Sequence, residues 1–291
     1  MSAPPINTES TVKNLAKRIA TCIGLIAALA GQAAYAQEDD LLAKLKTTKK
    51  LDTAVGHSPA WSTLDASGQA TGIMPDITLA VLKKAGIDAT LNPVSMPFDS
   101  IIPALVSGKV DIAANTMFVT PARAKQVLFT DILFYNSEGM FVAKGNPLGI
   151  KSLADLCGHT GATYKGTVWT AVLEKASKEC PAGKSIEIRL YTSSDLVLQD
   201  VAAGRVNGGL VDQYAGLYAL VKDPSLKFEV ATGYVPANRA ANGAAFPINP
   251  RYKSFAAVFN KAYFELLADG TIKSIFEKYG MKPADVFLRR E

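Results

Sequence analysis

The chain has 291 residues, of which 48% are hydrophobic and 20% are charged, as is usual for a globular protein. This length allows one large domain or two smaller ones, each with its own hydrophobic core. The formal net charge is +5 at pH 7 and falls to +3 without residues 1–36. The basic residues are scattered and form no basic run with interleaved aromatics, so we expect no nucleic-acid partner.

The first 36 residues have the pattern of a secretory signal peptide. Basic residues at 13–18 precede an apolar segment at 19–30, and an Ala-x-Ala cleavage site ends at Ala36. The apolar segment is too short to span a bilayer comfortably, which argues against a membrane anchor. Cys22 lies inside it without the small-residue box of a lipoprotein. We therefore expect a soluble, exported mature protein.

Two cysteines, Cys157 and Cys180, remain after the signal peptide is removed. An even number in an exported chain favours one disulfide. The alternative is a pair of free buried thiols. A catalytic thiol is not expected, because neither of the two histidines is obviously placed to serve it.

Strand-like and helical patterns alternate along the chain after a charged lead-in at 37–49, which we expect to be flexible. A strand-like segment at 51–55 is followed by helical spacing at 76–85 and 98–107, and each helical segment ends at a glycine. This alternation predicts an α/β fold with a mainly parallel sheet.

The second half of the chain repeats part of this layout. Residues 201–207 (Val-Ala-Ala-Gly-Arg-Val-Asn) are similar to residues 105–111 (Leu-Val-Ser-Gly-Lys-Val-Asp). Aligning the two glycines places Asp212 opposite Thr116, each at the carboxyl end of a strand, where open α/β sheets bind ligands. The alternative is chance similarity, because helix-glycine-strand is a common pattern.

The segment 108–129 carries the strongest chemical signal. Thr120 is suited to cap a helix and Pro121 to begin it, which places Arg123 in the first turn beside backbone N–H groups. An arginine beside unpaired N–H donors is a receptor for a carboxylate. The alternative is a solvated charge on a helix surface.

This segment closely resembles the periplasmic solute-binding proteins of polar amino-acid ABC importers, solute-binding protein family 3. The shared pattern is Gly-Lys-Val-Asp, then Thr-x-x-Arg, then Phe-Thr-Asp, found here at 108–111, 120–123 and 129–131. The resemblance extends from about residue 51 to the C-terminus. It implies an α/β fold of two lobes (type II), with the chain crossing twice between them.

The resemblance also implies domain boundaries. They are 1–36 for the signal peptide, 37–49 for the lead-in, 50–132 and 243–291 for lobe 1, 138–237 for lobe 2, and 133–137 and 238–242 for the two hinge crossings.

A zwitterionic ligand needs a cation for its carboxylate and an anion for its ammonium group. Arg123 would bind the carboxylate and, by similarity to the family, Asp212 would bind the ammonium from the other lobe. The alternative role for Asp212 is to cap the helix that starts near Gln213. Thr116 and Asn115 resemble the family's contacts to the carboxylate and the ammonium, respectively.

Further ligand contacts are expected from a glycine loop and from aromatic side chains. Gly166 and Thr167 precede a helical segment at 168–175, where backbone N–H groups can receive a carboxylate oxygen, as in the family; an ordinary capped helix start is the alternative. The aromatic candidates for the cleft are Phe98, Trp61, Phe118, Tyr164 and Trp169. The first loop departs from the family pattern, because Ser58 stands where many relatives have a stacking tyrosine, which leaves Trp61 or His57 as substitutes.

The resemblance implies the periplasmic substrate-binding component of an ABC importer, a monomer that captures an amino acid or related zwitterion by domain closure and docks on an inner-membrane permease. No cofactor or metal is expected, because metal-ligand spacing, a Walker loop and Gly-x-Gly-x-x-Gly are absent.

The alternatives to this function are a periplasmic dehydratase-type enzyme on the same scaffold and a ligand-sensing domain. The enzyme is disfavoured because there is no paired-carboxylate motif, and the sensor because no signalling module follows. The sequence leaves the exact solute open.

Overall fold

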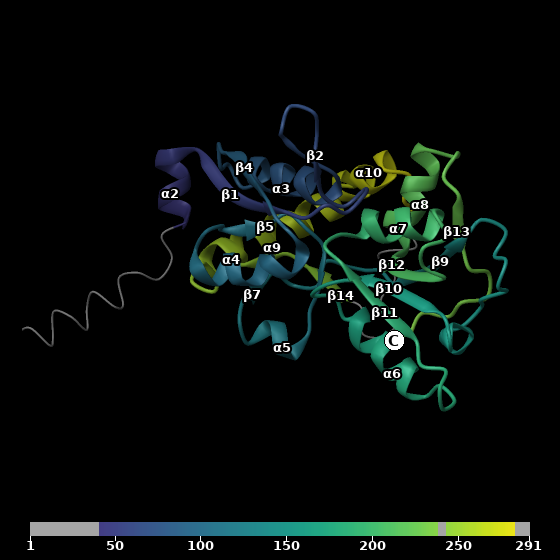
Figure 1. Cartoon of the computed structure of the whole chain (residues 1–291). Helices are drawn as coiled ribbons and strands as arrows, with labels where there is room; N and C mark the ends of the chain where they lie inside the picture. Colours follow the sequence, from purple (N-terminus) through teal and green to yellow (C-terminus); the bar gives the residue numbers. More distant parts are fainter. Residues whose placement is uncertain (1–40, 238–242, 283–291) are drawn as a thin grey trace, which may run out of the picture. The chain divides into compact units, whose positions relative to one another are not determined.

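The computed structural model describes residues 41–237 and 243–282, in which strands and helices alternate around two five-stranded sheets (Figure 1). This confirms the predicted α/β class. The predicted signal peptide at 1–36 and the predicted second crossing at 238–242 lie outside the described residues. Within the described part of the chain, no helix is long and apolar enough to cross a membrane.

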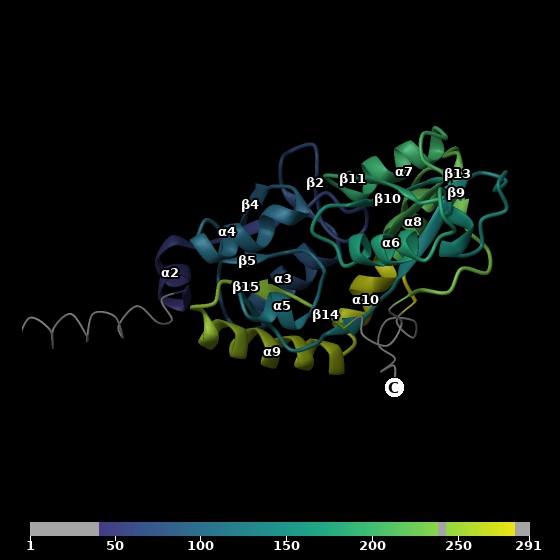
Figure 2. The same ribbon diagram turned by 60° about the horizontal axis from the view of Figure 1, so that its bottom comes forward.

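The first sheet has the strand order β4-β1-β5-β15-β7. Its strands are β1 (Lys50–Val55), β4 (Thr90–Ser95), β5 (Ile112–Ala113), β7 (Leu128–Phe129) and β15 (Pro247–Ile248). Strands β4 and β5 are parallel to β1, whereas β15 pairs antiparallel with β5 and β7. The helices around this sheet are α3 (Ile73–Lys84), α4 (Ile101–Ser107), α9 (Lys253–Ala268) and α10 (Thr271–Lys278). Figure 2 shows that α9, from the C-terminal part of the chain, runs beside α3, so the chain returns to the first sheet.

The second sheet has the strand order β11-β10-β12-β9-β13 and is built from one continuous stretch of chain. Its strands are β9 (Glu138–Ala143), β10 (Thr160–Tyr164), β11 (Glu187–Tyr191), β12 (Gly208–Asp212) and β13 (Phe228–Val230). Strands β11 and β12 are parallel to β10, and β9 is antiparallel to β12 and β13. Helices α6 (Trp169–Lys178), α7 (Ser194–Ala202) and α8 (Gln213–Lys222) surround it (Figure 1).

Short elements connect and decorate the two sheets. They are the strands β2 (Thr63–Leu64), β3 (Ala70–Thr71), β6 (Met117–Phe118), β8 (Phe134–Tyr135) and β14 (Gly243–Ala245), helix α5 (Pro121–Ala124), and the 3-10 turns η1 (Phe98–Ser100) and η2 (Leu153–Leu156). Strand β14 pairs with both β6 and β8 in a three-stranded sheet. Two residues after β8 the chain enters β9 of the second sheet. The exact lobe boundaries remain a prediction.

The internal repeat found in the sequence corresponds to the same hydrogen bonds in both sheets. The two aligned glycines have left-handed backbone angles, with φ of 77° and 68°. After the first, the Asp111 side chain accepts a hydrogen bond from the Asp52 backbone N–H at 2.9 Å. After the second, the Asn207 side chain accepts one from the Thr160 backbone N–H at the same distance. The strand that follows each glycine is therefore anchored to its neighbour in the same way.

The described part of the predicted lead-in at 37–49, which begins at residue 41, differs from the flexible segment expected from the sequence. Its residues Leu41–Thr48 form helix α2, whose two buried leucines pack into the core. The Lys44 ammonium donates to Asp52 at 2.5 Å and to Asp111 at 2.7 Å. Charged residues that looked like a solvated segment thus hold a helix against the end of the first sheet.

Cys157 and Cys180 form the predicted disulfide, with their Cα atoms 5.5 Å apart. The bond joins the end of η2 to the segment that follows α6, so it ties together two connections beside the second sheet. The alternative of two free thiols is excluded.

Replacing both cysteines by serine should lower the free energy of unfolding by about 3 kcal/mol, because the bond closes a loop with a sequence separation of 23. Urea unfolding followed by circular dichroism measures this difference. Wild-type protein unfolded in the presence of a reductant is the control and should lose a similar amount. Equal midpoints for the oxidised protein and the double variant would contradict the prediction.

Candidate functional site

Arg123 is positioned by the short helix predicted from Thr120 and Pro121. Thr120 has an extended backbone at the N-cap and its hydroxyl accepts a hydrogen bond from the Arg123 N–H at 3.3 Å. Pro121 occupies the first helical position, as expected. The Arg123 side chain turns inward and is only 9% exposed. The alternative of a solvated surface charge is therefore excluded.

The guanidinium of Arg123 is buried without a counter-anion. It donates to the backbone carbonyl of Phe118 at 2.7 Å and to that of Gly166 at 2.8 Å. Among residues 41–237 and 243–282, no carboxylate forms an ion pair or a hydrogen bond with it. Burial lowers the pKa of Arg123 to about 10, so the group stays charged at neutral pH. A buried cation without a counter-anion among the described residues is stabilised when an anion binds beside it.

Asp212 supplies a buried opposite charge at the end of β12, where it is 2% exposed. Its Oδ1 accepts hydrogen bonds from the N–H groups of Tyr214 at 3.0 Å and Ala215 at 3.2 Å, so it caps helix α8. The same oxygen accepts a hydrogen bond from Trp61 Nε1 at 2.8 Å, and Asn136 Nδ2 donates to Oδ2. The capping role, which the sequence offered as an alternative, is thus real.

The environment of Asp212 disfavours its negative charge. Burial raises its pKa to about 6, although hydrogen bonds from Trp61, Ala215, Tyr214 and Asn136 act in the opposite direction. The carboxylate is therefore mostly ionised at pH 7, but at a cost in stability. A nearby positive charge would offset that cost.

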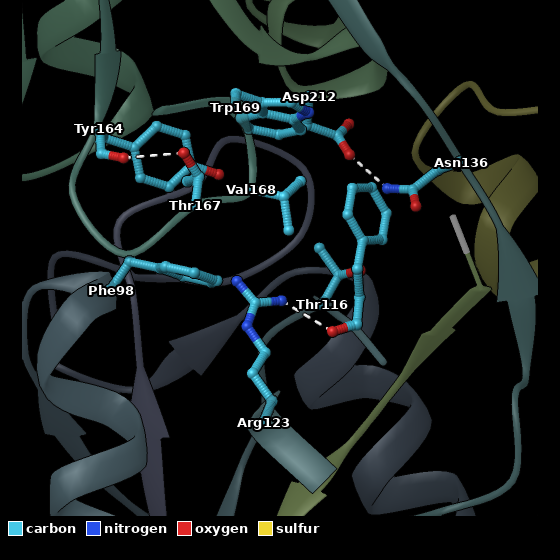
Figure 3. Close-up of a pocket in the computed structure, with 10 residues that line it drawn as sticks. Phe98, Thr116, Arg123, Asn136, Tyr164, Thr167, Val168, Trp169 and Asp212 are labelled. Atoms are coloured by element: carbon cyan, nitrogen blue, oxygen red, sulfur yellow. Dashed lines mark hydrogen bonds between the residues drawn. The ribbon is translucent and has the colours of Figure 1, made fainter. Parts of the chain in front are cut away.

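Arg123 and Asp212 line one cavity. The residues that line it are Phe98, Thr116, Phe118, Arg123, Asn136, Tyr164, Thr167, Val168, Trp169 and Asp212. In Figure 3, Arg123 extends from α5 on one side, and Asp212 and Trp169 come from the other. The two charges face a common space without pairing with each other.

Four aromatic rings form much of the cavity wall. Phe98 and Phe118 belong to segments that accompany the first sheet, and Tyr164 and Trp169 to segments of the second sheet. The pairs Phe98–Tyr164, Phe118–Trp169 and Tyr164–Trp169 meet edge to face, with ring centroids 5.5, 6.0 and 5.7 Å apart. The wall is therefore continuous across the two halves of the site.

Three atoms on the lining residues are buried polar groups without a hydrogen-bond partner: Thr116 Oγ1, Asn136 Oδ1 and Trp169 Nε1. Leaving such groups unpaired is costly, so native proteins rarely do so without a reason. Their gathering in one cavity indicates a place built to receive a polar molecule.

Eight of the eleven residues predicted to bind ligand line the cavity: Arg123, Asp212, Thr116, Thr167, Phe98, Phe118, Tyr164 and Trp169. The other three lie around it. Trp61 is fully buried and does not line the cavity. It stacks on Phe134, with ring centroids 5.2 Å apart, and its Nε1 donates a hydrogen bond to Asp212. Gly166 contributes its carbonyl to Arg123, and the side chain of Asn115 packs against Gly56.

The first loop does not supply a substitute for the family's stacking tyrosine on the cavity wall. The His57 ring is hydrogen-bonded to Ser95 Oγ at 2.8 Å, and the Ser58 backbone closes a tight turn with Ser62. Both residues line a different cavity.

Sequence reasoning missed Asn136 and Val168, which line the cavity. Asn136 lies in the predicted first crossing, where its side chain reaches Asp212. The available signal for Asn136 was its position as a polar residue between the aromatic strand β8 and the buried strand β9. Val168 gave none, because a valine before a helix is an ordinary core residue. Among the described residues, no group of three or more His, Cys, Asp or Glu side chains is placed to hold a metal.

Comparisons with known proteins agree with this arrangement. The family model of bacterial extracellular solute-binding proteins, family 3, matches residues 51–282. The lysine/arginine/ornithine-binding periplasmic protein of Escherichia coli (strain K12) is 28% identical over 239 residues, covering 81% of this chain and 89% of the relative.

Two solved structures are also similar. An ancestral arginine-binding protein bound to glutamine is 28% identical with a TM-score of 0.69, over 79% of this chain and 97% of that one. The ancestral amino acid-binding protein AncCDT-1, a precursor of cyclohexadienyl dehydratase, is 25% identical with a TM-score of 0.69, over 82% and 98%.

The fold and the charged cavity define a two-lobed α/β protein that binds a small solute. The chain belongs to the bacterial extracellular solute-binding proteins, family 3, as its motifs indicated.

The raised pKa of Asp212 should make ionisation destabilising. Its folded-state pKa of about 6 lies above the ordinary value of 3.8, so the folded protein binds the proton more tightly than the unfolded chain. Stability is therefore lost as pH rises from about 4 to about 6, by roughly 3 kcal/mol in total.

The difference in the free energy of unfolding between wild type and Asp212→Asn isolates this effect, because the other titrating groups are common to both proteins. Urea unfolding at pH 4 and pH 7 should show the variant gaining about 2 kcal/mol relative to wild type over that interval. Parallel pH profiles would show that Asp212 titrates normally.

Proposed function

We propose that this protein is the periplasmic substrate-binding component of an ABC importer and that it captures an amino acid or a related zwitterion between its lobes. The observation that carries the proposal is the pair of unmatched charges: the Arg123 cation and the Asp212 anion line the same cavity and do not bind each other. A zwitterion presents the two complementary charges at short range.

The carboxylate of the ligand would bind at Arg123. A guanidinium has five N–H donors, and only two donate here, to the carbonyls of Phe118 and Gly166. The unpaired hydroxyl of Thr116 lines the same cavity and can donate to a carboxylate oxygen. Helix α6 begins beside the cavity, and its first N–H groups add positive potential.

The ammonium group would bind at Asp212 and Asn136. Asn136 uses its Nδ2 to donate to Asp212, which leaves its Oδ1 as an unpaired acceptor on the cavity wall. A carboxylate and an amide oxygen next to each other suit an ammonium, which carries three N–H donors. The ligand would thus satisfy an atom that is now buried without a partner.

Capture would depend on closure, because the two charges belong to different lobes. Arg123 lies on α5, beside the first sheet, and Asp212 ends β12 of the second sheet. Hydrogen bonds already bridge the halves, among them those from Arg123 to Gly166 and from Trp61 to Asp212. Only a conformation with the halves together offers both charges to one small molecule, so binding would stabilise that conformation. The closed form would then dock on an inner-membrane permease as a monomer.

We also propose that the protein binds its solute without converting it. Asp212 is held by four hydrogen-bond donors that fix its orientation, and no second carboxylate or histidine is among the ten residues that line the cavity. Because the similar protein AncCDT-1 is a precursor of a dehydratase, the enzyme alternative calls for a direct test. Incubation with a prephenate-like compound and analysis of the products by mass spectrometry should return the compound unchanged; formation of a dehydrated product would overturn this part.

Arg123→Ala should weaken binding by roughly tens to thousands of fold, corresponding to about 2–5 kcal/mol, because the desolvated carboxylate of the ligand loses its cation. Titration calorimetry with an amino acid found in a thermal-shift screen measures the effect. Lys125→Ala is the matched control, since Lys125 follows the same helix but is exposed. Unchanged affinity in the Arg123 variant, or equal losses in both variants, would refute the proposed role.

A further inference from the structure

The charges on the cavity wall restrict the kind of zwitterion that fits. Arg123 and Asp212 are the charged side chains among the ten lining residues. If they bind the carboxylate and the ammonium, no anion on the wall remains for a second positive charge on the ligand. We propose, on the basis of the proposed function, that the natural solute is a zwitterion with an uncharged side chain and that amino acids with cationic side chains are excluded.

A second buried acid, Glu138, lies outside the cavity. Glu138 pairs with Asp212 across strands β9 and β12 and is fully buried. Its Oε1 accepts hydrogen bonds from the Tyr234 hydroxyl at 3.1 Å and from the Ala237 N–H at 2.6 Å, and the residue does not line the cavity. Oε1 therefore holds the segment before residue 238, whereas Oε2 has no hydrogen-bond partner among the described residues. Because Glu138 does not line the cavity, it is not placed to neutralise a ligand side chain there.

The aromatic wall is a poor substitute for an anion. Three pairs of its rings meet edge to face, and each such contact directs the negative face of one ring at the positive edge of another. The face of Phe98 is occupied by the Arg123 guanidinium, whose central carbon lies 5.7 Å from the ring centroid. A second cation would also be repelled by Arg123, which lines the same cavity.

The remaining wall suits an uncharged group. Phe98, Phe118, Tyr164, Val168 and Trp169 offer apolar surface, and the same cavity must also hold the two charged ends of the ligand. The unpaired Nε1 of Trp169 adds one hydrogen-bond donor to this wall. A compact side chain that is apolar, or that carries one neutral acceptor, matches these groups.

Matched ligand pairs test the proposal on the mature protein, because each pair differs mainly in charge. Titration calorimetry would compare norleucine with lysine and citrulline with arginine. We expect each neutral member that binds to do so about a hundredfold or more tightly than its cationic partner. Lysine or arginine binding as tightly as its neutral partner would overturn the inference and leave the proposed function standing. If no amino acid or related zwitterion binds, the proposed function itself fails, and this inference with it.

A variant that adds the missing anion provides a second test. Trp169 begins helix α6, where an acidic residue is favourable, and it lies on the Asp212 side of the cavity in Figure 3. Trp169→Glu should bind lysine or arginine at least about tenfold more tightly than Trp169→Gln, which opens the same space without a charge. Thermal unfolding of both variants checks that they fold to a similar extent. Equal, weak binding by two folded variants would contradict the inference that charge excludes these ligands; if neither folds, the wild-type ligand pairs decide.

Discussion

The structure depends on two buried charges of opposite sign that share a cavity without touching. Each is satisfied locally: Arg123 by two backbone carbonyls, and Asp212 by donors that include Trp61 and Asn136. Hydrogen bonding keeps both groups in place, but it does not cancel their net charges. The empty site therefore carries a free-energy cost. A small dipolar molecule would relieve it by bringing a negative group to Arg123 and a positive group to Asp212. A stable ion pair between the two side chains would remove that cost and the reason to bind.

The repeated sheet topology is what brings such groups to one place. In both sheets a left-handed glycine ends a helix, and an acid or amide side chain anchors the next strand to its neighbour. Thr116 follows that strand in the first sheet, and Asp212 ends it in the second. Because ligands gather at the carboxyl ends of strands in open α/β sheets, two such ends facing one cavity make a site from two ordinary halves.

Local patterns predicted the parts that depend on neighbouring residues. Helix spacing with a terminal glycine identified the segment at 98–107, which forms η1 and α4, and capping chemistry placed Arg123. Contacts between distant segments were not predictable in this way. Helix α2 was taken for a flexible segment because Lys44 finds its partner at Asp111, far along the chain. Asn136 was missed, and Trp61 was assigned to the wall, because only the folded arrangement shows which side of Asp212 each side chain approaches.

Gly166 has a structural consequence beyond the carbonyl that it offers to Arg123. Its φ is +81°, and a Cβ atom built there would lie 2.9 Å from the Cα of Asp99, which belongs to the other half of the molecule. Any larger residue would act as a spacer that keeps the two backbones from meeting. Contact between the backbones of Gly166 and Asp99 therefore limits how closely the two halves can approach at this point. The absence of a Cβ atom in glycine is what allows this close approach.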